Sequence, residues 1–182
     1  MTFNLRVPRA ILLLARWLQQ RVAALAPIRV DSLEDAIWSE IVTLLPQPDV
    51  AHVLRELAQL GMPMAAVSNA AFSGRVLLAE LARHGLATHL QFVVSSADFG
   101  RRKPDINLLQ VAVAQLGVAA SDVWFIGDTL REDIAGAVSA GLQPVWFGMH
   151  QGADQQTDVP LLETWSRFDA LYSTARIVAP AG

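Results

Sequence analysis

The chain has 182 residues, of which 53% are hydrophobic and 17% are charged, with a formal net charge of −3 at pH 7. The length is typical of one domain, and the composition excludes disordered, collagen-like and low-complexity proteins. The weak negative charge argues against nucleic acid or an anionic membrane as the main partner. The sequence has no cysteine, which excludes disulfides, thiolate zinc sites and a cysteine nucleophile.

Residues 8–60 are expected to be helical. The apolar run at residues 10–15 is too short to span a bilayer, and Arg16 interrupts it, so we expect no export signal and a cytoplasmic protein. Apolar residues then recur at helical spacing: Ile11, Leu14, Leu18 and Val22. A second helix is expected to begin at Asp31-Ser32 and to stop before Pro46, and a third covers about 49–60. Residues 8–47 therefore form a reduced helical cap or appendage on a single domain covering residues 1–182.

Beyond residue 60, short apolar runs alternate with helices. The runs at 62–67, 92–94, 123–126 and 144–147 contain no regular polar alternation, which is typical of buried parallel strands. Helices are expected over 75–84, 106–116 and 128–140, each followed by a glycine that ends it. The pattern predicts an α/β fold, a Rossmann-like three-layer arrangement with one parallel sheet between two layers of helices.

Polar residues follow the predicted strands, and the ligand crevice of such sheets lies at the carboxyl ends of the strands. Ser68 and Asn69 can bind a phosphoryl oxygen, while Lys103, the only lysine of the chain, can supply a positive charge. Asp128 and Asp133 can hold Mg²⁺ together with water and a substrate phosphate. Each element also has a purely structural interpretation: a helix cap for Ser68-Asn69, a solvated basic loop for Lys103, and favourable charges on a helix N-terminus for the two aspartates.

In this order, these residues resemble the haloacid dehalogenase-like (HAD) superfamily, in particular its phosphatase-like branch. Residues 66–69 (Ala-Val-Ser-Asn) resemble the second motif of the family, residues 96–105 the third and residues 125–133 the fourth. The resemblance covers about residues 48–150 and implies a Rossmann-like fold with a small helical cap. It also implies that Ser68 hydrogen-bonds the phosphoryl group, that Lys103 stabilises it, and that Asp128 and Asp133 serve a magnesium site.

The first motif of the family, Asp-x-Asp-x-Thr, is missing, because no Asp-x-Asp occurs anywhere in the chain. In the most similar segment, residues 3–8, Asn4 and Arg6 stand where the family has its nucleophile and its general acid/base. An amide does not accept a phosphoryl group as a carboxylate does, and arginine stays protonated and cannot act as a base.

Two hypotheses remain open. In the first, the chain is an inactive or weak hydrolase homologue that retains phosphate binding and binds Mg²⁺ poorly. In the second, it is an active Mg²⁺-dependent phosphohydrolase whose native first strand is absent from this chain. Both imply a small phosphorylated molecule or inorganic phosphate as the partner, and the apolar composition is compatible with a homodimer.

Overall fold

The computed structural model describes residues 30–148 and 158–178; Asn4, Arg6 and the helix expected from Ile11 onwards lie outside the described residues. The described strands form two parallel ladders. The first pairs β1 (Ala65–Ser68) with β2 (Phe92–Ser95). The second has the order β3 (Trp124–Gly127), β4 (Gln143–Phe147) and β5 (Leu161–Leu162). The predicted α/β class with parallel strands is confirmed, and we call the two ladders of described strands the two half-sheets.

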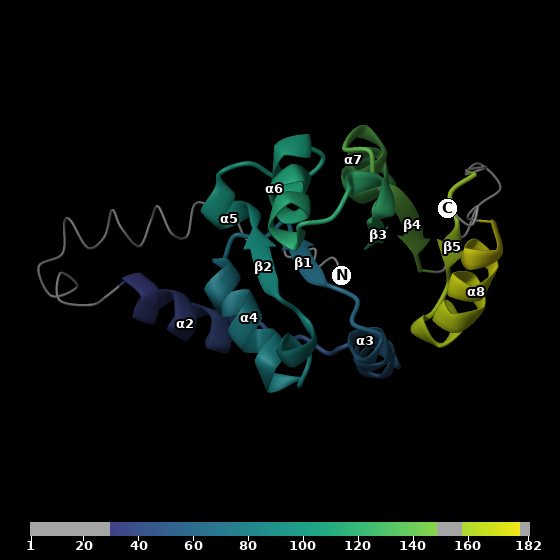
Figure 1. Ribbon diagram of the computed structural model, residues 1–182. Helices are drawn as coiled ribbons and strands as arrows, with labels where there is room; N and C mark the ends of the chain where they lie inside the picture. Colours follow the sequence, from purple (N-terminus) through teal and green to yellow (C-terminus); the bar gives the residue numbers. More distant parts are fainter. Residues whose placement is uncertain (1–29, 149–157, 179–182) are drawn as a thin grey trace, which may run out of the picture.

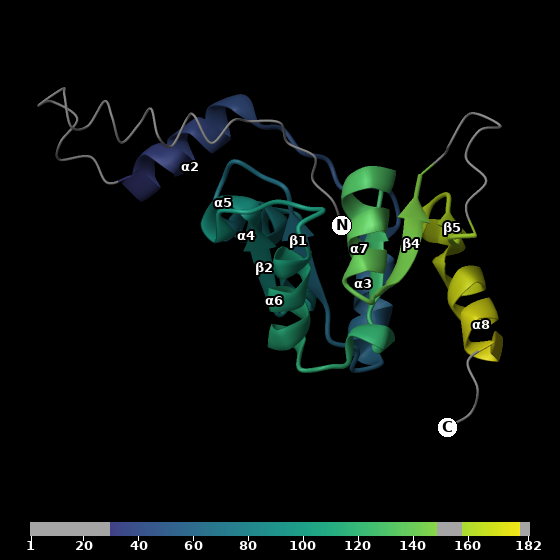
Figure 2. The same cartoon turned by 90° about the horizontal axis from the view of Figure 1, so that it is seen from above.

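Helices cover both faces of these strands (Figure 1). One layer contains α5 (Ser96–Phe99), α6 (Ile106–Leu116) and α7 (Ala135–Ser139), which a short π-helical turn, η4 (Leu130–Ile134), precedes. The other contains α3 (Val50–Gln59), α4 (Gly74–Arg83) and α8 (Phe168–Val178). Three short 3₁₀ turns, η2 (Ala87–His89), η3 (Ala120–Asp122) and η5 (Trp165–Arg167), complete the described elements. Seen from above, the β1–β2 half with α4, α5 and α6 lies beside the β3–β5 half with α7 and α8 (Figure 2).

Capping residues explain where the helices begin and end. Asp105 accepts a hydrogen bond from the backbone of Asn107, and Gly117 takes a left-handed φ of 70°, so α6 has the bounds that the sequence predicts. The helix α2 (Val30–Ile41) begins one residue before Asp31 and ends well before Pro46, which corrects both expected ends. The residues after Ile41 are irregular rather than helical up to α3.

Helix α2 is fastened to α4 by buried contacts. Trp38 is 1% exposed and packs edge-on against Phe72, with 4.9 Å between the ring centroids. Its indole N–H donates to the Glu80 carboxylate of α4 at 2.9 Å. The Glu34 carboxylate accepts from the backbone and hydroxyl of Ser73, the residue that caps α4. This helix is therefore packed onto the α/β body by its own core cluster.

Two further apolar clusters hold the strands between the helical layers. One includes residues of α3, β4, β5, η5 and α8, and the other includes residues of β1, α6 and α7. In the described part of the chain, no helix is both long and apolar enough to cross a membrane.

Candidate functional site

The polar residues that follow the strands meet around a buried ion pair. The Lys103 ammonium lies 2.7 Å from Oδ1 of Asp133, and both side chains are 0% exposed. The same ammonium donates to the backbone carbonyl of Val67 in β1 at 3.0 Å and lies 5.4 Å from the ring centroid of Phe125 in β3. Lys103 therefore connects the two half-sheets at the carboxyl ends of their strands.

Asp133 fits against β3 only because residue 127 is glycine. A Cβ atom at Gly127 would lie 2.3 Å from the Asp133 Cβ, a distance that no packing tolerates. Oδ2 of Asp133 accepts hydrogen bonds from the backbone N–H and the hydroxyl of Thr129, at 3.0 and 2.6 Å. Both carboxylate oxygens of Asp133 are thus engaged within the protein.

Asn69 ties the loop after β1 to the loop that carries Lys103. Its side-chain oxygen accepts from the backbone N–H of Lys103 at 2.8 Å, and its amide donates to the backbone carbonyl of the same residue at 3.1 Å. The amide also donates to Glu132 at 2.9 Å, and Glu132 accepts from Arg102 at 3.0 Å. Asn69 therefore has a clear positioning role toward Lys103, whereas its predicted role in phosphate binding stays a prediction.

Serines at the end of β2 hold the loop that leaves β1. Ser68 is 1% exposed at the end of β1. The hydroxyl of Ser95 donates to the Phe72 carbonyl at 2.6 Å, and that of Ser96 bonds with both backbone groups of Ala70. Asp98 accepts from the first N–H of α4, at Gly74. The structure thus brings Ser68, Asn69, Lys103 and Asp133 to one end of the strands, as the sequence predicts.

Burial and the ion pair shift the pKa values of both partners. Burial lowers the pKa of Lys103 below its usual range, although the Asp133 carboxylate acts in the opposite direction. Burial alone would raise the pKa of Asp133, but the Lys103 ammonium and the hydrogen bonds from Thr129 outweigh it, so that this pKa is lowered. Asp133 is consequently a carboxylate at neutral pH.

The described residues show no assembled magnesium site. Mg²⁺ takes oxygen ligands in octahedral geometry, and each Asp133 oxygen already has one partner, Lys103 for Oδ1 and Thr129 for Oδ2. The Asp128 side chain is exposed. Within residues 30–148 and 158–178, no three histidine or carboxylate side chains lie close enough to hold a metal ion.

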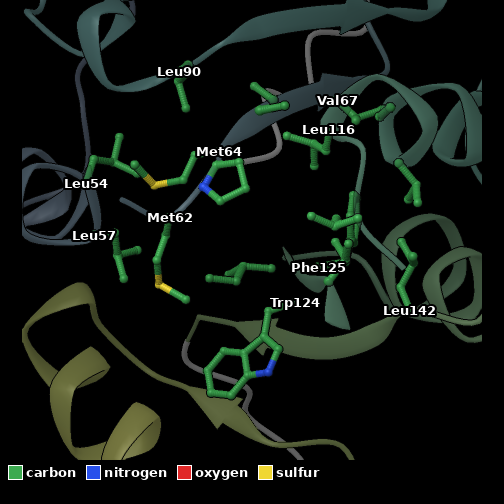
Figure 3. Close-up of a pocket in the computed structure, with 18 of the residues that line it drawn as sticks. Leu54, Leu57, Met62, Met64, Val67, Leu90, Leu116, Trp124, Phe125 and Leu142 are labelled. Atoms are coloured by element: carbon green, nitrogen blue, oxygen red, sulfur yellow. The ribbon is translucent and has the colours of Figure 1, made fainter. Parts of the chain in front are cut away.

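A cavity of about 310 Å³ separates β1 from β3, and we call it the slot (Figure 3). Its wall is almost entirely apolar and comes from both half-sheets and both helical layers. The labelled side chains around it include Met62, Met64, Leu57, Leu116 and Trp124. The slot leads along the strands toward the end where Lys103 contacts Val67 and Phe125.

Sequence reasoning missed three residues that position the site. Thr129 and Glu132 hold Asp133 and Asn69, and Gly127 makes room for Asp133. Thr129 and Glu132 lie within the segment that resembles the fourth motif, but no local pattern in the sequence shows which side chain each contacts. The glycine between an apolar run and Asp128 is the one signal that indicates a close approach.

Comparison with known proteins gives one family. The family model described as haloacid dehalogenase-like hydrolase matches residues 21–147. The chain is similar to a ribulose-1,5-bisphosphate 5-phosphatase of Halopiger xanaduensis, with 34% identity over 126 residues, which cover 68% of this chain and 51% of that protein. It is also similar to a phosphoserine phosphatase of Thermus thermophilus, with 31% identity, covering 66% of this chain and 48% of the relative. The chain therefore spans about half the length of these relatives.

Solved structures agree on the fold. A HAD-superfamily hydrolase from Ehrlichia chaffeensis superposes with a TM-score of 0.61 at 21% identity, covering 96% of this chain and 79% of that one. A HAD-hydrolase of Bacillus subtilis, YfnB, described as bound to magnesium, has a TM-score of 0.59 at 19% identity, covering 70% of this chain and 55% of its own. The family match covers well over half of the chain and includes every strand from β1 to β4, so this chain belongs to the haloacid dehalogenase-like hydrolase family.

Proposed function

We propose that this chain is a HAD-like hydrolase homologue that binds phosphate or a small phosphorylated molecule and hydrolyses phosphomonoesters negligibly. One observation carries the proposal: the buried carboxylate nearest to the site, Asp133, is held by Lys103 and Thr129. A carboxylate in an ion pair with both oxygens occupied is a poor nucleophile toward phosphorus. Because the chain has no Asp-x-Asp pair, no carboxylate of the chain matches the family's nucleophile motif.

Phosphate binding is supported by the donors at the ends of the strands. An ammonium has three hydrogens, and the contacts of Lys103 to Val67 and Asp133 account for two of them. Ser68 lies beside Val67 at the end of β1 and carries a hydroxyl that can donate. Two curated relatives are phosphatases, which is consistent with a small phosphorylated ligand.

The same geometry implies weak binding of Mg²⁺. A metal ion at Asp133 would lie close to the Lys103 ammonium, which is 2.7 Å from the same carboxylate and would repel the metal. We therefore propose that Mg²⁺ plays at most a minor part in this chain.

Two assays test the proposal with the full chain. Hydrolysis of p-nitrophenyl phosphate with Mg²⁺ should stay far below the turnover of about 1–1,000 per second that is usual for enzymes. Turnover in that range that Asp128→Ala abolishes would overturn the proposed lack of hydrolysis.

The second assay measures the melting temperature in phosphate and in chloride at equal ionic strength. Phosphate should raise it by ligand linkage, and Ser68→Ala should reduce that rise. Arg83→Ala should not, because Arg83 lies on α4 and pairs there with Glu80. An unchanged melting temperature at many millimolar phosphate would contradict phosphate binding.

A second candidate function is favoured by the slot. If a strand bearing Asp-x-Asp occupied it from outside residues 1–182, the assembled protein would be an active phosphohydrolase. The chain's coverage of only about half of each relative is consistent with this candidate. It predicts that a longer polypeptide that contains such a strand turns over phosphomonoesters while residues 1–182 alone do not.

A further inference from the structure

We propose that the Arg102 guanidinium binds a second anionic group, a carboxylate or a phosphate, on a ligand whose phosphoryl group is held at Ser68 and Lys103. The inference rests on the phosphate binding proposed above, and it narrows the ligand to a phosphate ester that carries a further acidic group. The motifs in the sequence assign Arg102 no role.

The buried floor of the candidate site carries no net positive charge. The Lys103 ammonium and the Asp133 carboxylate lie 2.7 Å apart and both side chains are 0% exposed, so their charges largely cancel for a ligand outside the pair. Asp128 adds another carboxylate directly after β3. Hydrogen bonds from Lys103 and Ser68 can hold one phosphoryl group, but a ligand with more negative charge needs another cation near the ends of the strands.

A chain of hydrogen bonds holds the Arg102 guanidinium beside the loop that follows β1. Its Nη2 donates to Oε1 of Glu132 at 3.0 Å, and Oε2 of Glu132 accepts from the Asn69 amide at 2.9 Å. Asn69 is 7% exposed and directly follows Ser68. Two hydrogen bonds therefore connect the guanidinium to the residue next to the predicted phosphate ligand.

The Arg102 side chain is accessible and has donors to spare. It is 60% exposed, and among the described residues the hydrogen-bond partner of its guanidinium is Glu132. A guanidinium has five N–H donors in a planar fork that matches a carboxylate or a phosphate. The remaining donors can bind an anion while Glu132 keeps its bond. Because that bond already orders the side chain, anion binding costs less conformational entropy.

Arg102 and Lys103 reach different depths of the site. The Lys103 ammonium is buried and donates to the backbone of Val67 in β1, whereas the Arg102 guanidinium is exposed. The Asn69 side chain lies between them, since it bonds to the backbone of Lys103 and to the carboxylate that holds Arg102. One phosphoryl group against Ser68 therefore leaves the guanidinium for a second group of the same ligand.

The preceding residue, Arg101, provides a matched control within the chain. It is 64% exposed and pairs with Asp105 at 2.9 Å, much as Arg102 pairs with Glu132. Asp105 caps α6 by accepting from the backbone of Asn107. Arg101 is thus held toward α6 and not toward the loop after β1.

Calorimetric titration of the full chain at constant ionic strength tests the proposal. Glycerol phosphate is the probe with one anionic group. In phosphoglycerate a carboxylate replaces the hydroxymethyl group, and in propanediol bisphosphate a phosphate is the second group, so the two probes distinguish the sources of the second charge. A charge-assisted hydrogen bond to the guanidinium should make at least one of them bind about tenfold more tightly than glycerol phosphate.

Arg102→Met should remove this preference and leave the affinity for glycerol phosphate unchanged, while Arg101→Met should preserve both. Urea unfolding of the two variants should match that of the parent chain, because both side chains are exposed. A preference that persists in Arg102→Met, or that Arg101→Met also removes, would overturn the proposal. Weaker binding of glycerol phosphate by Arg102→Met would overturn it as well, because the guanidinium would then bind the phosphoryl group itself.

Two further outcomes separate this inference from the proposed function. Equal affinity for the three probes, with inorganic phosphate also bound, would refute the second anionic group and leave the proposed phosphate binding intact. No binding of any probe or of inorganic phosphate would refute both.

Discussion

Replacing Lys103 by methionine should destabilise the protein by about 3–5 kcal/mol, the usual cost of breaking a buried ion pair. Methionine has a similar shape but no charge, so Asp133 would remain a fully buried carboxylate with only Thr129 as its partner. Two unit charges 2.7 Å apart attract each other by about 6 kcal/mol at an effective dielectric constant of 20. The variant also avoids the free-energy cost of removing the ammonium from water. That gain offsets part of the lost attraction, so the net loss of stability falls to about 3–5 kcal/mol.

Equilibrium unfolding in urea, followed by the fluorescence of the five tryptophans, measures this cost. For a chain of this size the melting temperature should fall by about 6–20 °C. Arg102→Met is the matched control, because Arg102 is 60% exposed in its pair with Glu132, and exposed pairs contribute about 0–1 kcal/mol. In a double-mutant cycle, Lys103→Met and Asp133→Asn should be coupled by about 1–3 kcal/mol. Additive effects, or a cost of Lys103→Met below about 1 kcal/mol, would refute the reasoning.

Three other predictions concern stability. Gly127→Ala should cost about 3 kcal/mol in urea unfolding, because the new methyl group overlaps Asp133. Trp38→Ala should cost about 3–5 kcal/mol, since it removes a buried ring and the donor to Glu80, while Leu78→Ala at an exposed site should cost less than about 1 kcal/mol. The lowered pKa of Asp133 stabilises the folded state above about pH 4, and this stabilisation is lost as the pH falls through the folded value. Melting temperatures between pH 6 and pH 2.5 should therefore fall less steeply below pH 4 for Asp133→Asn than for the parent chain.

Local patterns in the sequence predicted most of the fold. Helix α6 was predicted over its full length, because Asp105 and Gly117 mark its two ends by chemistry that acts within a few residues. Strand β5 has only two residues, and its pairing with β4 is a long-range contact that no local pattern encodes.

The sequence predicted which residues lie together at the candidate site, but not which of their side chains contact each other. The order of the strands predicted that Ser68, Asn69, Lys103 and Asp133 lie together, and the structure places them at one end of the strands, while their roles in binding stay predictions. That Lys103 would be fully buried against Asp133 was not foreseen, because burial depends on the packing of β1, β3 and η4 around it. The expected magnesium role of Asp133 stays a prediction.

The way Lys103 joins the half-sheets also bears on the order of events during folding. Ala65 pairs with Phe92 and Trp124 with Gln143, so each ladder forms within a limited stretch of the chain. The bond from Lys103 to Val67 spans 36 residues and needs β1 and the loop before α6 in place together. Because contacts between distant residues are costly to form early, we expect this junction to close after the ladders that it connects. Weakening the Lys103–Asp133 ion pair should therefore accelerate unfolding far more than it slows folding. The ion pair would then act chiefly by slowing the unfolding of the folded protein.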